Sequence, residues 1–166
     1  MNKPTKIVHI VFTALSWALL IAGFIYVAAV WKEIPDEVGR HFAENGEFDL
    51  YGSKNIAFYH PFIADILMLA LFEACGFAAM KIKPSAKLDR IGNEIMYCAV
   101  VFMTDLFKLC SATFFLYWIH LVARQIPMNT VYPQILVIGA AVCFAAITVT
   151  AVVVKIKHGI KSKKEK

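Results

Sequence analysis

Charged side chains are scarce in this sequence. Asp, Glu, Lys and Arg make up 17% of its 166 residues, whereas soluble domains average about 25%. Apolar side chains make up 60%, above the roughly 45–50% of a typical globular chain. These proportions exclude a disordered chain and argue against a soluble enzyme.

Cysteine is also scarce, and the four cysteines lie where they cannot form a disulfide framework. All fall inside long apolar runs, none lies in an intervening polar segment, and no CxxC pair occurs: Cys75, Cys98, Cys110 and Cys143. We therefore expect them to be small buried apolar residues rather than metal ligands.

Motifs that carry enzyme chemistry are missing too. The sequence has no nucleophile elbow, no glycine-rich phosphate loop, no paired-histidine metal motif and no nucleic-acid-binding signature. We predict a non-enzymatic protein with no cofactor, no metal ion and no nucleic-acid partner.

The apolar residues that are present form four long runs, over residues 7–31, 56–80, 96–122 and 131–154. A membrane core of about 30 Å needs about 20 helical residues, so each run is long enough to cross it. The ten-residue alternation of membrane β-strands does not occur. The sequence predicts an all-α membrane protein, a single domain of four transmembrane helices. Its connecting segments are 32–55, 81–95 and 123–130, and its basic tail is 155–166.

Basic residues are distributed unevenly between the predicted sides of the membrane. Twelve of the 17 lie before the first span, between spans two and three, or after span four: Lys3, Lys6, Lys81, Lys83, Lys87, Arg90, Lys155, Lys157, Lys161, Lys163, Lys164 and Lys166. Because basic segments are retained on the cytoplasmic side, both termini are predicted to be cytoplasmic. Segment 32–55 is then an acidic outer loop.

The outer loop carries local signals of its own. Pro35 suits a first helical turn, and Val38 and Phe42 would share one helix face, so we expect a short interfacial helix. Asn45-Gly46 would end it in a turn. We expect an extended piece, Glu47–Tyr51, to lead back to the membrane.

The same loop resembles a known family. The runs IPDEVGRHF (34–42) and GEFDLYGSKN (46–55) are similar, in order and spacing, to the segment that follows the first span in the SdpI-like family of bacterial membrane proteins. The resemblance spans Ile34–Asn55 and implies an immunity or signal-sensing role for the loop, toward an extracytoplasmic peptide or envelope signal. Its signature positions are Pro35, His41, Phe42, Gly46, Asp49, Gly52, Ser53 and Lys54.

His41 allows two interpretations. With Glu37 and Glu44 nearby in sequence it could bind a cation or respond to external pH. Alternatively, its ring hydrogen-bonds a carboxylate or a loop carbonyl and fixes the turn. Metal sites usually need three or four protein ligands, which favours the second interpretation.

Four ionisable residues lie inside the second and third spans: Asp65, Glu73, Asp105 and Lys108. Counting the helical rise from the middle of each span, Glu73, Asp105 and Lys108 are predicted to meet at one depth. An isolated charge in the bilayer costs at least about 2.5–3.5 kcal/mol, so these groups are expected to pair inside the bundle. Three acids against one base leave surplus negative charge.

The surplus has a functional and a structural interpretation. With His60 and His120 near the outer ends and Glu94 near the inner end, the carboxylates could form a broken polar track for protons or a small cation. Alternatively, an ion pair and a hydrogen-bonded carboxyl group fix the register of two helices.

Three hypotheses follow. The leading one is a signal-sensing or immunity protein that binds its ligand through the acidic outer loop. The first alternative is a small cation- or proton-coupled transporter that uses the intramembrane carboxylates. The second is an accessory subunit of a larger membrane complex. The expected partners are the lipid bilayer, a peptide or membrane protein, and further copies of the chain.

Overall fold

The computed structural model describes residues 3–81 and 83–159, most of which are helical. Four long helices follow one another with a small hairpin after the first: α1 (Lys3–Val30), β1 (Glu37–Phe42), β2 (Phe48–Ser53), α2 (Lys54–Lys81), α3 (Arg90–Arg124) and α4 (Val131–His158). Each helix is long and apolar enough to cross a membrane, as predicted. Lys161, Lys163, Lys164 and Lys166 of the basic tail lie outside the described residues.

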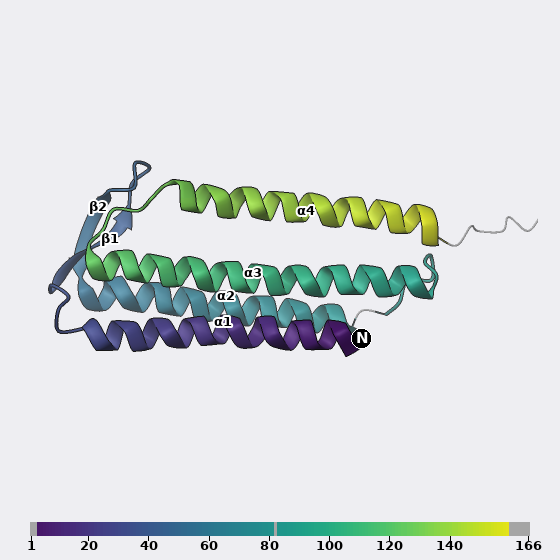
Figure 1. Cartoon of the computed structure of the whole chain (residues 1–166), viewed down its shortest axis with the longest axis horizontal. Coiled ribbons are helices and arrows are strands. Elements are labelled where there is room, and N and C mark those ends of the chain that lie inside the picture. The colour runs from purple at the N-terminus through teal and green to yellow at the C-terminus, as the bar shows by residue number, and fades with distance from the viewer. Residues whose placement is uncertain (1–2, 82, 160–166) are drawn as a thin grey trace, which may run out of the picture.

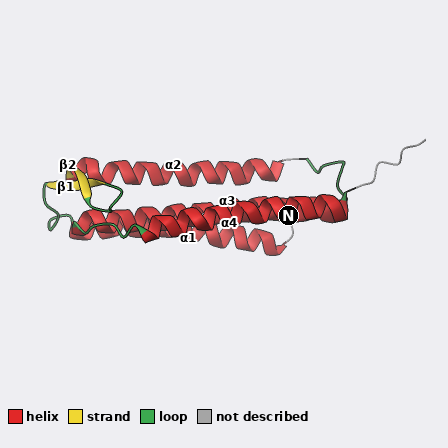
Figure 2. Ribbon diagram, turned by 90° about the horizontal axis from the view of Figure 1, so that it is seen from above, coloured by secondary structure: helices red, strands yellow, loops and turns green. Residues whose placement is uncertain are grey.

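Helix α3 is the centre of the helical assembly. Both α1 and α2 pack along it, and they contact each other much less than they contact α3. Among the described elements, helix α4 packs on α3 alone and does not contact α1 or α2 (Figures 1 and 2). The start of α1 and the end of α4 lie at one end of the molecule, and the hairpin lies at the other (Figure 1).

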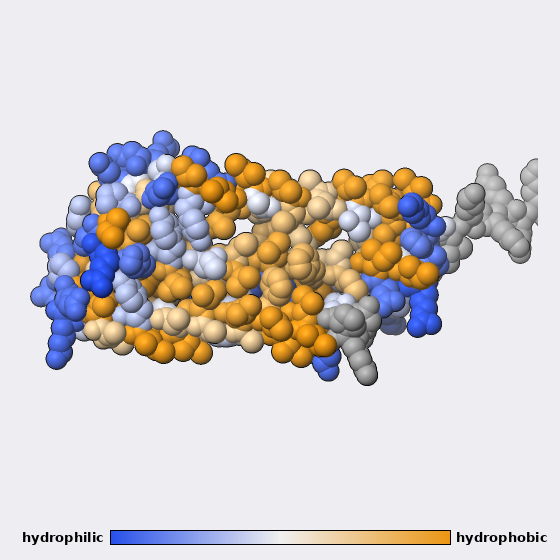
Figure 3. Space-filling view, in the orientation of Figure 1, coloured by the Kyte–Doolittle hydropathy of each residue, from blue (hydrophilic) through white to orange (hydrophobic). Residues whose placement is uncertain are grey.

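Many large apolar side chains point away from the helical assembly and remain exposed on its surface. The middle of the molecule is covered with apolar side chains, and hydrophilic residues gather at its two ends (Figure 3). Helix α4 is the extreme case, since Val137, Phe144 and Ile156 are each more than two-thirds exposed. An apolar belt between two polar ends is the surface of a helical protein whose solvent is lipid.

The outer loop is a β-hairpin, so the predicted interfacial helix is wrong. Residues Glu37–Phe42 pair antiparallel with Phe48–Ser53, with an irregular register between Gly39 and Phe42. Each strand supplies hydrogen-bond partners for the backbone N–H and C=O groups of the other. A helix of one or two turns would have left most of these groups without a partner in the segment. The Asn45-Gly46 turn and the extended return segment were predicted correctly: Gly46 has φ +84° and Phe48–Ser53 is the second strand.

The hairpin is fixed to the bundle by its buried side. Val38 is fully buried, and the ring of Phe42 packs edge-on against Trp118 of α3, with centroids 4.9 Å apart. The Gly39 N–H donates to Oε1 of Gln125 at the end of α3 (2.9 Å). At the turn, Met128 N–H donates to the Gly46 carbonyl (2.7 Å). A side chain at Gly46 would lie 2.1 Å from the Met128 carbonyl oxygen, so only glycine fits there.

The cysteines are free, but they are less buried than expected. Cys75 is exposed, and Cys98, Cys110 and Cys143 are half-buried. The expectation was wrong because the bundle has few fully enclosed positions: an apolar residue on a membrane helix can face lipid at no cost.

Candidate functional site

A cluster of ionisable side chains lies inside the bundle, built from three helices. His9 and Thr13 come from α1, Glu73 from α2, and Asp105 and Lys108 from α3. His9 and Thr13 are one helical turn apart, as are Asp105 and Lys108, so both pairs project from one face of their helix. Because α1 and α2 both pack on α3, their polar faces meet at a single depth.

Lys108 is the centre of the cluster and is only 1% exposed. Its Nζ lies 2.5 Å from Glu73 Oε2, 2.6 Å from Thr13 Oγ1 and 2.9 Å from Asp105 Oδ1. An ammonium group has three N–H donors. Each is therefore matched to one oxygen, which satisfies this cation away from water.

Asp105 is fully buried and is shared between two partners. Its Oδ1 lies 2.8 Å from His9 Nδ1 and 2.9 Å from Lys108 Nζ. Its Oδ2 is buried and has no hydrogen-bond partner among the described residues. The other ring nitrogen of His9, Nε2, lies 3.6 Å from Glu73 Oε1. His9 thus stands between two carboxylates.

The net charge of the cluster can be counted for a neutral and for a protonated His9. Glu73 and Asp105 contribute two negative charges when ionised, and Lys108 contributes one positive charge. With a neutral His9 the net charge is −1, and with a protonated His9 it is zero. The imidazole donates from Nδ1 to the Asp105 carboxylate, so a second proton would be held on Nε2, facing Glu73.

The sequence predicted three of these five residues. Glu73, Asp105 and Lys108 were expected to meet, and the structure brings them together. His9 and Thr13 were missed, because α1 was not expected to contribute to the cluster. The available signal was His9 itself, one of the few polar residues inside the first apolar run.

Asp65, the fourth predicted member, lies apart from the cluster. It is 1% exposed and two helical turns from Glu73, about 12 Å along α2. Ser111 of α3 hydrogen-bonds its carboxyl group, and its Oδ1 has no partner within the described part of the chain. Leu69, fully buried, lies between Asp65 and Glu73 on α2. The interior thus holds two polar positions separated by an apolar layer.

The remaining polar residues of the predicted track lie outside the bundle interior. His120 is exposed, and its Nδ1 lies 3.1 Å from the hydroxyl of Tyr26. His60 and Glu94 are exposed on α2 and α3. These three residues are therefore in contact with the surroundings of the bundle and not with the buried carboxylates.

The signature residues of the outer loop lie along the hairpin and at its junction with α2. Pro35 precedes β1, His41 and Phe42 are in β1, Gly46 is in the turn, Asp49, Gly52 and Ser53 are in β2, and Lys54 begins α2.

Two of these residues form an exposed pair across the hairpin. His41 Nδ1 lies 2.6 Å from Asp49 Oδ1, and both side chains are about half exposed. Lys54 holds the base of the loop, because its Nζ lies 3.0 Å from Asp36 Oδ1, 3.2 Å from the Ile34 carbonyl and 5.2 Å from the ring centroid of Trp31. His41 thus has the carboxylate partner of the second interpretation, although that partner is neither Glu37 nor Glu44.

The fold and the site define a class: a helical protein with four helices long and apolar enough to span a membrane, and with a cluster of ionisable side chains between three of them. Comparison with protein-family models, with curated proteins and with solved structures finds no match to this chain. In the described residues, no group of three or more His, Cys, Asp or Glu side chains could hold a metal ion.

Proposed function

We propose that this chain is a small, non-enzymatic transporter of the bacterial cytoplasmic membrane that couples to protons or a small cation. Its termini lie in the cytoplasm, where twelve of its 17 basic residues would then be found. The hairpin then faces the outside, and the cluster around Lys108 lies in the inner half of the membrane.

One observation carries the proposal: four ionisable groups from three helices form a network in which His9, Asp105 and Lys108 are buried and Glu73 is 39% exposed. Its net charge is −1 with a neutral His9 and zero with a protonated His9. Two carboxylates and one lysine would suffice to fix helix register. The additional histidine, placed between the carboxylates, gives the network a site that gains and loses a proton. Ionisable residues that face the inside of a membrane bundle commonly mark ion or proton pathways.

The proposed mechanism uses both polar positions. A proton on His9 Nε2 neutralises the inner cluster and forms an ion pair with Glu73. Loss of that proton leaves the cluster with a net charge of −1 within the span, which is costly unless a cation replaces the proton or water reaches the partly exposed Glu73. Asp65, beyond Leu69, is the outer acceptor for the same proton or cation.

Proton flux in proteoliposomes tests the proposal, measured with a pH-sensitive dye under an imposed membrane potential. The wild-type protein is expected to exceed protein-free liposomes, and Glu73→Gln and Asp105→Asn to return flux to that background. Glu94→Gln is the matched control, because Glu94 is an exposed carboxylate on α3 outside the cluster. The proposal would be removed if the wild type and all variants gave the same proton flux and also gave the same Na⁺ and K⁺ flux when a gradient of either cation replaces the proton gradient.

Signal sensing through the hairpin is the second candidate, and the His41–Asp49 pair favours it. The pair is exposed on a hairpin whose other side is fixed to α3, so a ligand that binds there acts on the bundle directly. In a cell-based assay of protection or signalling, sensing requires His41→Ala or Asp49→Ala to abolish the response while Glu73→Gln has little effect. Transport requires the reverse.

A further inference from the structure

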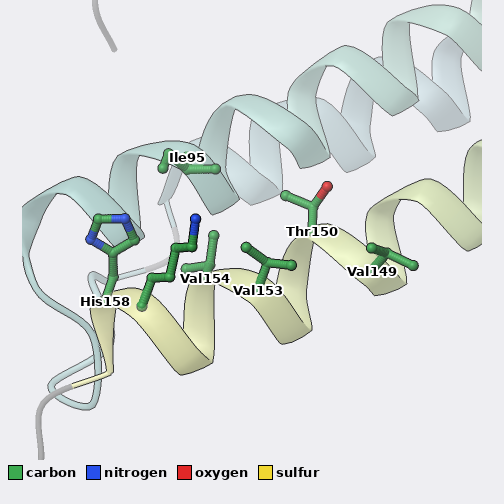
Figure 4. A pocket seen from close by; sticks show the side chains of 7 residues that line it. Ile95, Val149, Thr150, Val153, Val154 and His158 are labelled. Carbon is green, nitrogen blue, oxygen red and sulfur yellow. The ribbon is translucent and has the colours of Figure 1, made fainter.

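A cleft opens between α3 and α4 at the end of the molecule opposite the hairpin. It has a volume of about 330 Å³ and is lined by Ile95 of α3 and by six residues of α4: Val149, Thr150, Val153, Val154, Lys157 and His158 (Figure 4). Most of its wall is aliphatic, and its polar lining is concentrated toward the end of α4.

The cleft opens sideways, toward the space that lipid would occupy. Helix α4 packs on α3 alone among the described elements, so neither α1 nor α2 covers the groove. Gaps between α4 and the rest of the molecule are visible in the space-filling view (Figure 3). Val149 and Val153 remain 61% and 42% exposed. An apolar groove of this kind excludes water, and in a membrane it is filled by an acyl chain.

Basic side chains outnumber acidic ones at the end of the cleft, where Glu94 is the exposed acid beside Ile95. Lys157 is exposed and makes no ion pair within the described residues. The acid of the adjoining segment, Asp89, is already used: its Oδ1 accepts from Gly92 N–H (2.7 Å) and its Oδ2 lies 3.0 Å from His158 Nδ1. Lys155 and Arg90 add two exposed cations at the same end.

We propose that this cleft binds an anionic phospholipid of the bilayer. One acyl chain lies along Ile95, Val149 and Val153, and the phosphate pairs with Lys157. A basic group beside an apolar groove between transmembrane helices is the arrangement that recognises anionic lipid headgroups. The proposal requires membrane insertion but not proton coupling, so the flux measurements above and the lipid measurements below can fail separately.

Native mass spectrometry of the detergent-purified full chain tests the proposal, with dioleoylphosphatidylglycerol and dioleoylphosphatidylcholine as competing probes. The anionic lipid is expected to be retained in preference to the zwitterionic one, and Lys157→Gln to weaken its binding about fivefold. Lys87→Gln is the matched control, since Lys87 is exposed in the segment before α3 but does not line the cleft. It should bind like the wild type.

A second variant tests the apolar part of the site. Val153→Trp fills the groove and is expected to reduce retention of both lipids, with unchanged helix content by circular dichroism. Inorganic phosphate alone should not compete, because it offers no acyl chain. Equal affinity for the two lipids, no effect of Lys157→Gln, competition by phosphate, or a two-chain species that forms in place of the lipid complex would each overturn the proposal.

Discussion

Lys108 shows how a charged residue can be accommodated within an apolar bundle. It is 1% exposed, and three oxygens from three helices accept from its ammonium group. Burying an ammonium group without partners is costly, so the benefit of Lys108 lies in the carboxylates that it neutralises. Its removal leaves Asp105, which is fully buried, with only His9 as a counter-charge.

Lys108→Met is therefore expected to destabilise the protein by about 3 kcal/mol or more, because it leaves an uncompensated buried charge. The effect can be measured by unfolding in mixed micelles with increasing SDS. Lys32→Met is the control, since Lys32 is exposed at the end of α1. The role assigned to Lys108 is incorrect if the two variants unfold at the same SDS fraction.

At the scale of residues, the sequence indicated which charged side chains lie inside the spans, but it did not indicate all the residues that they contact. Glu73, Asp105 and Lys108 were predicted to meet because helical rise places them at one depth. His9 and Thr13 were missed because the sequence of a single span does not say which neighbour it faces. The partner of His41 was missed for a related reason: Asp49 becomes adjacent only through strand pairing.

At the scale of elements, the helices were predictable and the outer loop was only partly so. Twenty or more apolar residues predict a spanning helix whatever surrounds them. In contrast, Glu37–Phe42 contains Val38 and Phe42, which suit one face of a helix and also a buried strand. Pairing with Phe48–Ser53 decides between them. That pairing depends on a turn and a docking surface on α3, neither of which local propensity describes.

The start of α3 contacts the end of α4 through Asp89 and His158, and the stability of this contact should depend on pH. Asp89 caps α3, and the Gly92 N–H that donates to it, together with its hydrogen bond to His158, lowers the pKa of the Asp89 carboxyl below its ordinary value of 3.8. A lowered folded-state pKa means that this stabilisation is present above about pH 3.8 and is lost as the pH falls through the folded value.

We expect amide exchange in the first turn of α3 to accelerate below pH 4, after correction for intrinsic rates, while the middle of α3 stays protected. Asp89→Asn keeps a capping oxygen but removes the charge, so its exchange should vary much less over the same range. The assignment fails if both proteins show the same pH dependence.

At the scale of the whole molecule, both ends of the described chain lie toward the same end, opposite the hairpin. The four apolar helices account for this arrangement, because an even number of crossings returns the chain to the side on which it began. In the proposed membrane arrangement, the polar ends seen in Figure 3 would face the two membrane surfaces. Composition was sufficient to predict this much, whereas the detachment of α4 from α1 and α2 was not predictable from it.

The sidedness can be measured with a membrane-impermeant maleimide. Glu44→Cys, exposed beside the hairpin turn, should react in intact cells. Lys87→Cys, exposed before α3, should react only after the membrane is permeabilised. The parent protein, with its four native cysteines, gives the background. The opposite pattern would place the hairpin in the cytoplasm.

The contact between α1 and α3 also constrains how the protein is made. His9 and its partner Asp105 are separated by 96 positions, and a ribosome adds roughly 5–20 residues per second. His9 is therefore added to the chain on the order of 5–20 s before Asp105 exists. Until then the first helix must wait without its Asp105 partner, first inside the ribosome and then in the bilayer or beside the insertion machinery. The bundle cannot close until the third helix has been released laterally into the lipid.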